Sequence, residues 1–539
     1  MNNGGGFNSA ASGSDYSQQN AAQYALSGLT SSGAGNVVLC ATASADMVGN
    51  VFKCTGGTNF TVGWFEITSV SVGVSFTCST NAAGTAVTTG VGASGTGNIG
   101  GSLSLNSSSD STWFAQTQAG NMVWIKNGSF TLGQAVSAFN GGTQAPIVIA
   151  GYNTSRGDNP TGSNRPTIAN GANTLTTGTN VWLKNIIFTG TGVGIVSLGA
   201  SGLAVNCKFS NNSTTAARSC LTVNGANTTI WNCEVISYRG IAISQGSSAH
   251  VEGCYIHDSD IGIKNSGAVA SVYINNIISD NVTAAIQISS ADTAVTTVWN
   301  CTLYGAENKR GTGISLATGT TLFRVLNSIV YGFTTGISHA DTTQTVSYDD
   351  YNAFFNNTAD ASGWTKGSND IALNPSFSSV AQITGTGVST SGSVLTDNSA
   401  NFSTVTDNVD FVYISAMTGG NGTGKYLITG HTNTTITTDL ALGSGSGVSY
   451  QITTGHNFAV GTNMKAVAFP GLFQAGLTTG YMDIGAVQRE GGTSTDPGVA
   501  NVLNGTNYVI DDQSLTGTLM QSSGGGNIEN KMTGRSGFA

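Results

Sequence analysis

Two aspartates, Asp258 and Asp280, form the best candidate for acid–base chemistry in the sequence. Each lies five residues after a member of a repeated motif, so the repeat should place them on consecutive structural units, one above the other. Stacked in this way, their carboxyl groups would lie about 5 Å apart, which is the separation that a retaining glycosidase uses. His257, Asp260 and Glu252 are their close neighbours in the chain. The pair therefore suggests hydrolysis of a glycosidic bond.

A structural interpretation competes with the catalytic one. Aspartate is a favoured turn residue at the end of a strand. The equivalent positions of other repeats also hold turn residues, namely Asn211, Ser237, Gly305 and Gly332. The sequence contains no spacing typical of a Ser-His-Asp triad, no phosphate-binding loop and no HExxH zinc motif. It therefore predicts no cofactor, no metal site and no catalytic residue beyond Asp258 and Asp280.

The residues that would position this pair belong to a repeat of 21 to 27 residues, here called a coil. Its anchor column is Asn185, Asn206, Asn232, Gly253, Asn275, Asn300, Asn327 and Asn352. The positions one and three residues after the anchor are mostly Cys and large apolar residues, whereas the position between them mixes charged and apolar residues such as Lys208, Glu234 and Tyr255. A period of two is that of a strand with one buried face. Further apolar columns lie before the anchor and later in each coil, which predicts three short strands per coil.

The anchor residues suit a sharp corner between two strands. A corner requires a residue with positive φ, which Asn tolerates best among non-glycine residues and which Gly253 adopts without steric cost. Stacked Asn side chains can also form a hydrogen-bonded ladder from coil to coil. The Cys residues that follow, Cys207, Cys233, Cys254 and Cys301, fit the inside of the corner as small apolar residues. Because Ile186, Asn276 and Ala353 occupy the same column, we interpret it as core packing and not as a metal site.

The composition excludes several classes of protein. Only 8% of the 539 residues are charged, against roughly 25% in an average globular protein. The 75 Gly and 6 Pro favour an all-β chain. A net charge of −9 without a basic stripe argues against nucleic acid as a partner. The first residues lack the features of a secretory signal, and no apolar run is long enough to span a membrane, so we expect synthesis in a cytoplasm with reduced Cys. A pairing of Cys54 with Cys78 stays open.

These motifs resemble the pectin-lyase-like right-handed parallel β-helix superfamily, which holds pectate lyases and many phage tailspikes. GNMVWIKNGSFTL at 120–132 is similar to a first coil, and NPSF at 374–377, NFAV at 457–460 and DIGAVQ at 483–488 are similar to closing segments. A pectate lyase would need stacked Asp residues for calcium and an Arg base on one face. The sequence shows no such Asp stack, and Arg239, Arg310 and Arg324 lie at different phases of the coil. DPGVANVLNGTNYVIDDQSLTGTLMQ at 496–521 resembles a tail of phage structural proteins.

A second repeat lies outside the coils. DMVGNVFKC at 46–54 aligns with DNVDFVYIS at 407–415, and the strands that follow each segment share the same order, which predicts two small antiparallel β-barrels. We therefore expect an extended N-terminal arm at 1–30, a barrel at 31–105, a parallel β-helix at 106–382, an inserted barrel at 383–455, a closing β-helix segment at 456–490 and a C-terminal tail at 491–539. Barrels at both ends of a rod would cover exposed strand edges and provide docking surfaces.

The sequence therefore predicts a virion structural protein, such as a fibre, a spike or a capsid decoration, which mediates assembly or attachment without catalysis. Its expected partners are other virion proteins and copies of itself, with a trimer by analogy with phage spikes, and its expected location is the virion and, after lysis, the extracellular space. The alternative is a tailspike that binds and cuts a host-surface polysaccharide as a glycosidase or lyase. Outward aromatic residues, namely Trp231, Tyr255 and Trp299, would then line its groove.

Overall fold

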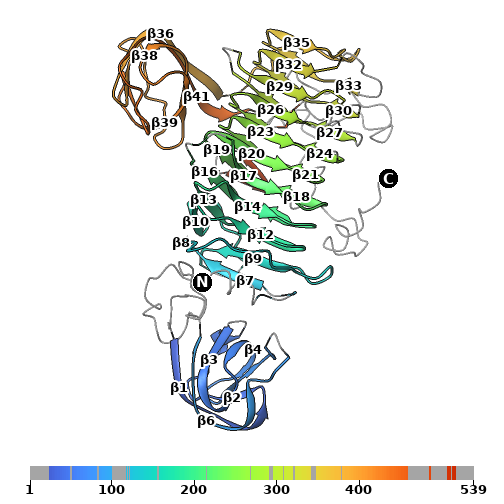
Figure 1. The fold of residues 1–539 in the computed structure, drawn as a ribbon, viewed down its shortest axis with the longest axis vertical. Helices are drawn as coiled ribbons and strands as arrows, with labels where there is room; N and C mark the ends of the chain where they lie inside the picture. Colours follow the sequence, from blue (N-terminus) through green and yellow to red (C-terminus); the bar gives the residue numbers. More distant parts are fainter. Residues whose placement is uncertain are drawn as a thin grey trace.

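The computed structural model describes residues 24–99 and 117–458 with short interruptions, together with 114, 485–486, 507–510 and 513–516. Its architecture is a parallel β-solenoid made of three sheets, with two closed six-stranded antiparallel barrels (Figure 1). The predicted fold class is thereby confirmed. Two short 3-10 turns, Ala45–Met47 and Gly162–Asn164, interrupt the strands. In the part of the chain described, no helix is long and apolar enough to cross a membrane.

Sheet I contains the strand that precedes the Asn corner of each coil. Neighbouring strands are parallel and in register, as in the pairs Ile230–Val251 and Val298–Val325. The ten strands are β7 (Met122–Lys126), β9 (Ile147–Tyr152), β12 (Val181–Lys184), β15 (Leu203–Val205), β18 (Thr228–Trp231), β21 (Ala249–Glu252), β24 (Ser271–Ile274), β27 (Thr296–Trp299), β30 (Phe323–Leu326) and β33 (Tyr348–Asp350).

Sheets II and III contain the second and third strands of the coils. Sheet II consists of β8 (Ser129–Thr131), β10 (Thr167–Gly171), β13 (Ile187–Gly190), β16 (Lys208–Asn211), β19 (Glu234–Ser237), β22 (Tyr255–His257), β25 (Ile277–Ser279), β28 (Thr302–Tyr304), β31 (Ile329–Tyr331) and β34 (Ala353–Phe355). Sheet III consists of β11 (Leu175–Thr176), β14 (Gly194–Leu198), β17 (Arg218–Val223), β20 (Gly240–Gln245), β23 (Ile261–Asn265), β26 (Ala284–Ile288), β29 (Thr312–Leu316), β32 (Thr335–His339) and β35 (Ala359–Ser362).

The corner between sheets I and II has the predicted backbone conformation. Six anchor Asn residues have φ between 50° and 56°, and Gly253 has φ of 62°. The expected amide ladder is also present, since Asn300 Nδ2 donates to Asn275 Oδ1 and Asn327 Nδ2 donates to Asn300 Oδ1, both at 2.6 Å. Asn232 donates in the same way to Asn206 at 2.6 Å. Gly253, which has no side chain, interrupts the ladder.

Asn300→Val tests the corner. The change places a β-branched residue at a φ of 54° and removes two ladder hydrogen bonds at a buried position. We expect the free energy of unfolding to fall by about 2 kcal/mol or more, seen as a lower melting temperature in calorimetry. Asn300→Gly is the control, because it removes the same hydrogen bonds without backbone strain and should cost less. Equal melting temperatures for Asn300→Val and the wild type would contradict the role of the corner.

The last coil departs from the predicted register by one residue. Tyr351, not Asn352, has the left-handed conformation, with φ of 59°. Leu326 pairs with Asp350, so Tyr351 is the structural equivalent of Asn327. Asn352 lies instead in the inward column, where it is buried and its Oδ1 accepts a hydrogen bond from the Ser328 backbone N–H at 2.9 Å. The same shift places Asp349 in an inward column that Val325 and Val298 occupy in the preceding coils.

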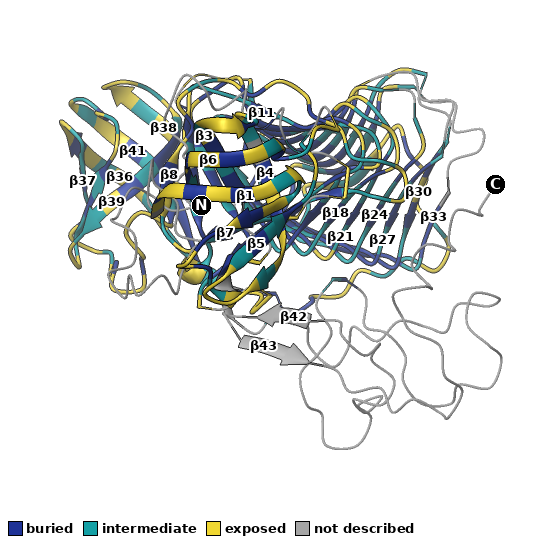
Figure 2. Ribbon diagram, turned by 90° about the horizontal axis from the view of Figure 1, so that it is seen from below, coloured by how far each residue is buried: buried dark blue, intermediate teal, exposed yellow. Residues whose placement is uncertain are grey.

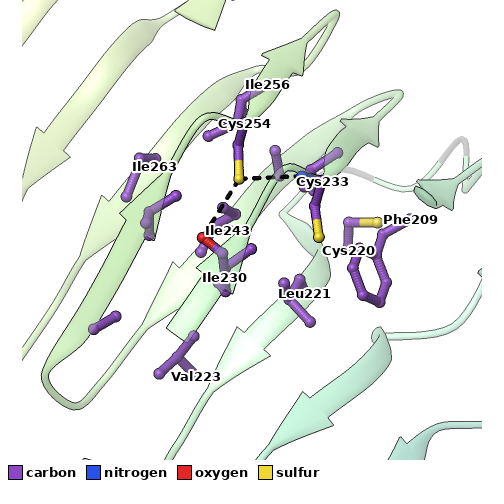
Figure 3. Close-up of a cluster of buried hydrophobic side chains, with 14 of the residues drawn as sticks. Phe209, Cys220, Leu221, Val223, Ile230, Cys233, Ile243, Cys254, Ile256 and Ile263 are labelled. Atoms are coloured by element: carbon purple, nitrogen blue, oxygen red, sulfur yellow. Dashed lines mark hydrogen bonds between the residues drawn. The ribbon is translucent and has the colours of Figure 1, made fainter. Parts of the chain in front are cut away.

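The interior of the solenoid is a continuous apolar core to which all three sheets contribute (Figure 3). Identical or similar residues stack from coil to coil, as in the parallel rings of Phe188 and Phe209, whose centroids lie 5.3 Å apart. The Cys column points inward as predicted: Cys207, Cys233, Cys254 and Cys301 are all at most 2% exposed. Burial raises the pKa of Cys301 to about 12, and it also raises the pKa values of Cys207 and Cys233 well above the usual value of a thiol. All eight Cys are free thiols, including Cys54 and Cys78.

The two barrels share one topology. The first consists of β1 (Tyr24–Gly35), β2 (Val37–Leu39), β3 (Val51–Phe60), β4 (Gly63–Ser71), β5 (Ser75–Cys78) and β6 (Thr88–Ile99). The second follows β35 in the chain and consists of β36 (Ser379–Ser391), β37 (Val394–Thr396), β38 (Phe411–Gly419), β39 (Gly424–His431), β40 (Thr435–Thr438) and β41 (Gly445–Asn457). Exposed and buried residues alternate along β1 and β6 (Figure 2), as expected for strands with one face in a core.

The positions of the barrels differ from two expectations. The first barrel begins at Tyr24, inside the range predicted as an arm, because β1 pairs with β6 from Tyr24–Ile99 onward. The second barrel lies against the flank of the solenoid and not across its end (Figure 1). Residues 1–23 and most of the predicted closing segment and tail lie outside the described residues. Within the predicted tail, β42 (Asn507–Ile510) and β43 (Gln513–Thr516) form an antiparallel hairpin.

Candidate functional site

Asp258 and Asp280 lie directly after β22 and β25, where the chain turns from sheet II toward sheet III. Both have left-handed backbones, with φ of 51° and 54°. Aspartate tolerates this conformation better than most residues, which explains its presence at these turns. The structure stacks the two turns, since β22 and β25 are adjacent parallel strands. Both residues are buried, with exposed fractions of 8% and 2%.

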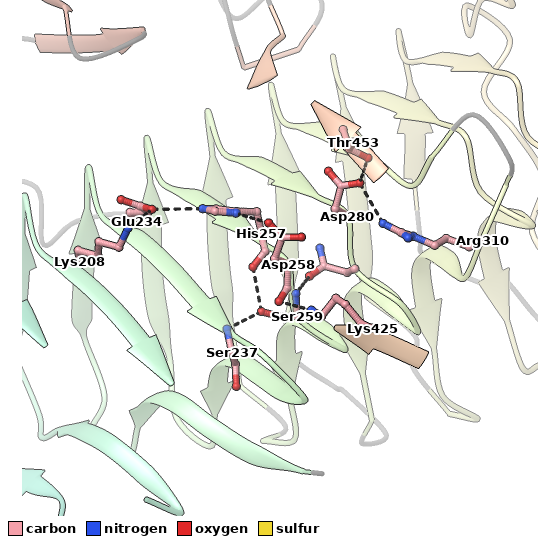
Figure 4. A network of polar contacts seen from close by, with 11 residues as sticks. Lys208, Glu234, Ser237, His257, Asp258, Ser259, Asp280, Arg310, Lys425 and Thr453 are labelled. Carbon is pink, nitrogen blue, oxygen red and sulfur yellow. Dashed lines mark hydrogen bonds and ion pairs between the residues drawn. The ribbon is translucent and has the colours of Figure 1, made fainter. Parts of the chain in front are cut away.

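The second barrel covers both aspartates. Asp280 Oδ1 accepts hydrogen bonds from Thr453 Oγ1 of β41 at 2.6 Å and from Arg310 Nη2 at 2.9 Å (Figure 4). The Lys425 ammonium, on β39, donates to the backbone carbonyl of Asp258. The side chains of Arg310 and Asp280 are 11% and 3% exposed, so their ion pair is almost fully buried. The turns that carry the candidate catalytic pair are thus a docking surface for the barrel.

Aromatic and backbone contacts extend this interface. The rings of Tyr238 and Phe411 lie 5.3 Å apart, and the Arg310 guanidinium lies 4.9 Å from the Tyr413 ring centroid. Tyr238 Oη donates to Asp439 Oδ1 at 3.0 Å, and burial together with this carboxylate raises its pKa. Arg239 Nη2 donates a hydrogen bond to the backbone carbonyl of Lys425 at 3.2 Å.

In the sequence, Arg239 and Arg310 lie at different phases of the coil and therefore do not predict a common site. Both bind the second barrel, although they lie on different coils. No local signal identifies such a contact, because the partners are separated by more than 100 residues in the chain. Only the position of the barrel shows that the acidic turns and these basic residues belong to one interface.

Lys425 is the central cation of the interface and is 3% exposed. Burial lowers its pKa to about 8, and the repulsion of Arg310 acts in the same direction, whereas the carboxylates of Asp258, Asp260 and Asp280 oppose the shift. An ammonium in this position is held by acidic turns of the solenoid. The electrostatic role of the aspartates is therefore to compensate a buried cation.

A second group of polar residues lies on the outer face of sheet II, beside the barrel. Lys208 Nζ and Glu234 Oε1 are 2.7 Å apart, and His257 bridges Glu234 and Asp258 through its two ring nitrogens, at 3.4 and 2.8 Å. Burial opposes ionisation of Glu234, but the hydrogen bond from His257 and the charge of Lys208 outweigh it and lower the pKa to about 2. Burial also opposes ionisation of His257 and by itself would lower its pKa. The hydrogen bonds and negative charges of Asp258 and Glu234 outweigh burial, so the pKa of His257 is raised. The group is therefore a fixed chain of ion pairs.

Among the described residues, the cavity between the solenoid and the barrel is too small for a sugar ring. A cavity of about 10 Å³ is lined by Asp258, Asp280, Arg310, Lys425 and residues of β38 and β41. A cavity of about 10–15 Å³ holds a single water molecule at most. A sugar ring could reach these carboxylates only if the barrel moved away.

The remaining residues named from the sequence do not gather on one surface. Trp231 and Trp299 lie on sheet I, separated by the strands of Glu252 and Ile274. Tyr255 lies on sheet II, where its ring stacks on His257 with centroids 3.9 Å apart.

The acidic neighbours of the pair also separate. Glu252 Oε2 lies 2.7 Å from His250 Nε2 on sheet I, away from the pair. Asp260 stays near Lys425, and burial raises its pKa while Lys425 and Arg239 lower it. Within the described residues, no three His, Cys, Asp or Glu residues are arranged to hold a metal ion.

Comparison with known proteins identifies the fold. Residues 193–441 match the family model described as "Right handed beta helix region". Together with the three stacked parallel sheets, this match shows that the central part of the chain is a right-handed parallel β-helix, which is the predicted fold. The match extends into the second barrel, where the chain forms antiparallel strands and no coil.

Several solved structures are similar to the chain at low identity. An alginate lyase of the PL6 family is 10% identical with a TM-score of 0.35, and the match covers 48% of this chain and 39% of the lyase. The tailspike protein gp49 from Pseudomonas phage LKA1 is 12% identical with a TM-score of 0.22, over 80% of this chain and 82% of the tailspike. The Dettilon tailspike protein is 12% identical with a TM-score of 0.27, over 63% and 88%. No curated protein matches the chain.

Proposed function

We propose that the protein is a structural component of a phage-like particle, a fibre, spike or capsid decoration whose barrels and termini make the contacts. The observation that supports this proposal best is the barrel–solenoid interface. The acidic turns that would be needed for catalysis hold the buried Lys425 and Arg310 instead. A solenoid clamped by its own inserted barrel is a rigid spacer, and its surface has few charges, which suits a protein that works outside a cell.

A receptor-cutting tailspike is the second candidate. The side chains of Lys208 and Glu234 are about one third exposed, and His257 connects them to Asp258. An acid–base pair could catalyse hydrolysis at this edge of the barrel while the barrel stays docked on the solenoid. In that case Glu234 would be the exposed carboxylate, and the half-buried Trp231 and Trp299 of sheet I could stack on a glycan chain.

Mass spectrometry of purified particles, together with a glycan-cleavage screen of the isolated protein, separates the two candidates. A structural protein is expected in particles at a fixed copy number and should release no sugar from host-surface polysaccharide. Absence from particles would contradict the proposal. Cleavage that disappears in both Glu234→Gln and Asp258→Asn, with the fold intact by circular dichroism, would establish the tailspike instead.

A further inference from the structure

The small cavity between the second barrel and the solenoid is lined by polar groups from both. Its volume is about 10 Å³, and the solenoid residues Asp258, Asp280 and Arg310 line it together with Lys425 and Gln451 of the barrel. A polar cavity of this size has room for one water molecule, which needs two to four polar partners. The question is therefore whether these groups offer the partners that a water requires.

The side chain of Gln451 is directed at the solenoid. Gln451 lies two residues before Thr453 on β41, so both side chains lie on the same face of the strand. Thr453 Oγ1 donates to Asp280 Oδ1 at 2.6 Å. Tyr413 of β38 pairs with Gln451, and its ring centroid lies 4.9 Å from the Arg310 guanidinium. The amide of Gln451 therefore lies next to the Asp280–Arg310 ion pair.

Docking of the barrel accounts for the burial of Gln451. The equivalent residue of the first barrel is Asn98, which pairs with Lys53 on β3 as Gln451 pairs with Tyr413 on β38. Asn98 is half-buried, whereas Gln451 is only 4% exposed. The barrel fold alone does not bury this position, so the site around Gln451 belongs to the interface.

Two N–H donors at the cavity have no acceptor in the protein. Gln451 Nε2 and Arg310 Nε are both buried, and within the described part of the chain no protein atom accepts a hydrogen bond from either. A buried donor without an acceptor is unfavourable, and native proteins pair such donors with protein groups or with ordered water. A ligand of this cavity thus has to accept hydrogen bonds.

The charges around the cavity select a neutral ligand. The carboxylates of Asp258, Asp280 and Asp410 line it and would repel an anion. A metal cation accepts no hydrogen bond, and it would also meet the positive charges of Arg310 and Lys425. Water accepts two hydrogen bonds and donates two, and a carboxylate has about four lone-pair sites to receive them. Water therefore satisfies the donors and the carboxylates together.

We infer that this cavity binds one water molecule, which joins the second barrel to the solenoid. The water accepts hydrogen bonds from Gln451 Nε2 of the barrel and Arg310 Nε of the solenoid, and it donates to the carboxylates of the acidic turns. A bridging water is nearly as favourable in enthalpy as a direct hydrogen bond. Because its partners come from both domains, the site exists only while the barrel is docked. Both candidate functions keep the barrel docked, so the inference depends on neither.

The test compares crystal structures and hydrogen exchange of three forms of the full chain. Gln451→Met keeps the size of the side chain and removes the donor, and Asn98→Leu makes the same kind of change at the equivalent position of the first barrel. Wild-type crystals are also soaked in bromide and in rubidium salts, whose anomalous signals would reveal an anion or a cation at the site. Hydrogen exchange is followed in peptides from β38 and β41.

We expect a density peak within hydrogen-bond distance of Gln451 Nε2 and Arg310 Nε in the wild type, without an anomalous signal in either soak. The peak should be lost in Gln451→Met, and β38 and β41 should exchange about fivefold faster or more, because a buried donor of the interface loses its partner. Asn98→Leu should keep the peak and the wild-type exchange of β38 and β41. Absence of the peak in the wild type, an anomalous signal, a peak that persists in Gln451→Met, or equal exchange in Gln451→Met and the wild type would each overturn the inference.

Discussion

Asp280→Asn is expected to loosen the second barrel from the solenoid and to lower the free energy of unfolding by about 3–5 kcal/mol, the usual cost of breaking a buried ion pair from one side. The Arg310 guanidinium would stay buried without its carboxylate, since its side chain is only 11% exposed. Asn tolerates the left-handed backbone of this position, so backbone strain does not contribute. Asn can also still accept the hydrogen bond of Thr453 Oγ1. The measured effect therefore reports the lost charge.

Hydrogen exchange under native conditions is the appropriate measurement, because a chain with several domains need not unfold in one step. Peptides from β38 and β41 should exchange faster in Asp280→Asn, whereas peptides from β1–β6 serve as an internal control and should not change. The double variant Asp280→Asn/Arg310→Leu removes the uncompensated cation and should be less unstable than the sum of the two single variants. Unchanged exchange in β38 and β41 would show that the ion pair does not hold the barrel.

The sequence was sufficient to predict the coils because their constraints are local. A corner at positive φ selects Asn or Gly, and an inward position selects a small or branched apolar residue, so both leave a periodic mark. Asn232 and Asn300 illustrate this, since each has the predicted conformation and the predicted ladder bond. The repeat pattern places the last coil one residue out of register. Tyr351 occupies the corner, although its residue type does not favour a positive φ, and the neighbouring Asn352 matches the pattern but points inward.

The site could not be predicted to the same depth because its contacts are not local. The residues Asp258 and Asp280 were identified correctly as a stacked pair at the exit of sheet II. Their environment depends on Lys425 and Thr453, which lie 167 and 173 residues further along the chain. A periodic pattern records which face a residue occupies, but not which other domain covers that face. The pattern of the barrel predicted its strands and not its docking site.

A carboxylate in the core of the last coil has a further consequence. Asp349 occupies the inward column of Val325 and is 3% exposed. The loop that contains Gly367 and Asp370 closes this end of the solenoid above it: Asp370 Oδ1 accepts from Asn352 N–H at 2.8 Å and Oδ2 from Gly367 N–H at 2.9 Å. Burial, and after it the negative charge of Asp370, raises the pKa of Asp349 from 3.8 to about 7.

This shift makes the stability of the closing coil depend on pH. Because the folded pKa lies above the unfolded one, the folded state holds the extra proton between about pH 4 and pH 7, and stability is lost as the pH rises through this window. Asp349→Asn removes the titrating group and keeps a polar side chain that can donate to Asp370. We expect it to stabilise the protein at pH 8 by up to about 3–4 kcal/mol, from a shift of roughly three pH units, and to have little effect at pH 4.

Asp350→Asn is the matched control. Asp350 is the next residue, also buried, but its Oδ1 accepts hydrogen bonds from Asn369 N–H at 2.8 Å and Tyr351 N–H at 3.1 Å, and its Oδ2 accepts from Asn369 Nδ2 at 2.9 Å. Neutralising it should lower stability at pH 8, because the carboxylate of Asp350 is satisfied by donors and that of Asp349 faces a like charge. If both variants were stabilised equally, the gain would come from the reduced net charge of the chain. Opposite signs, read from melting temperatures at pH 4 and pH 8, would locate the effect at the Asp349–Asp370 pair.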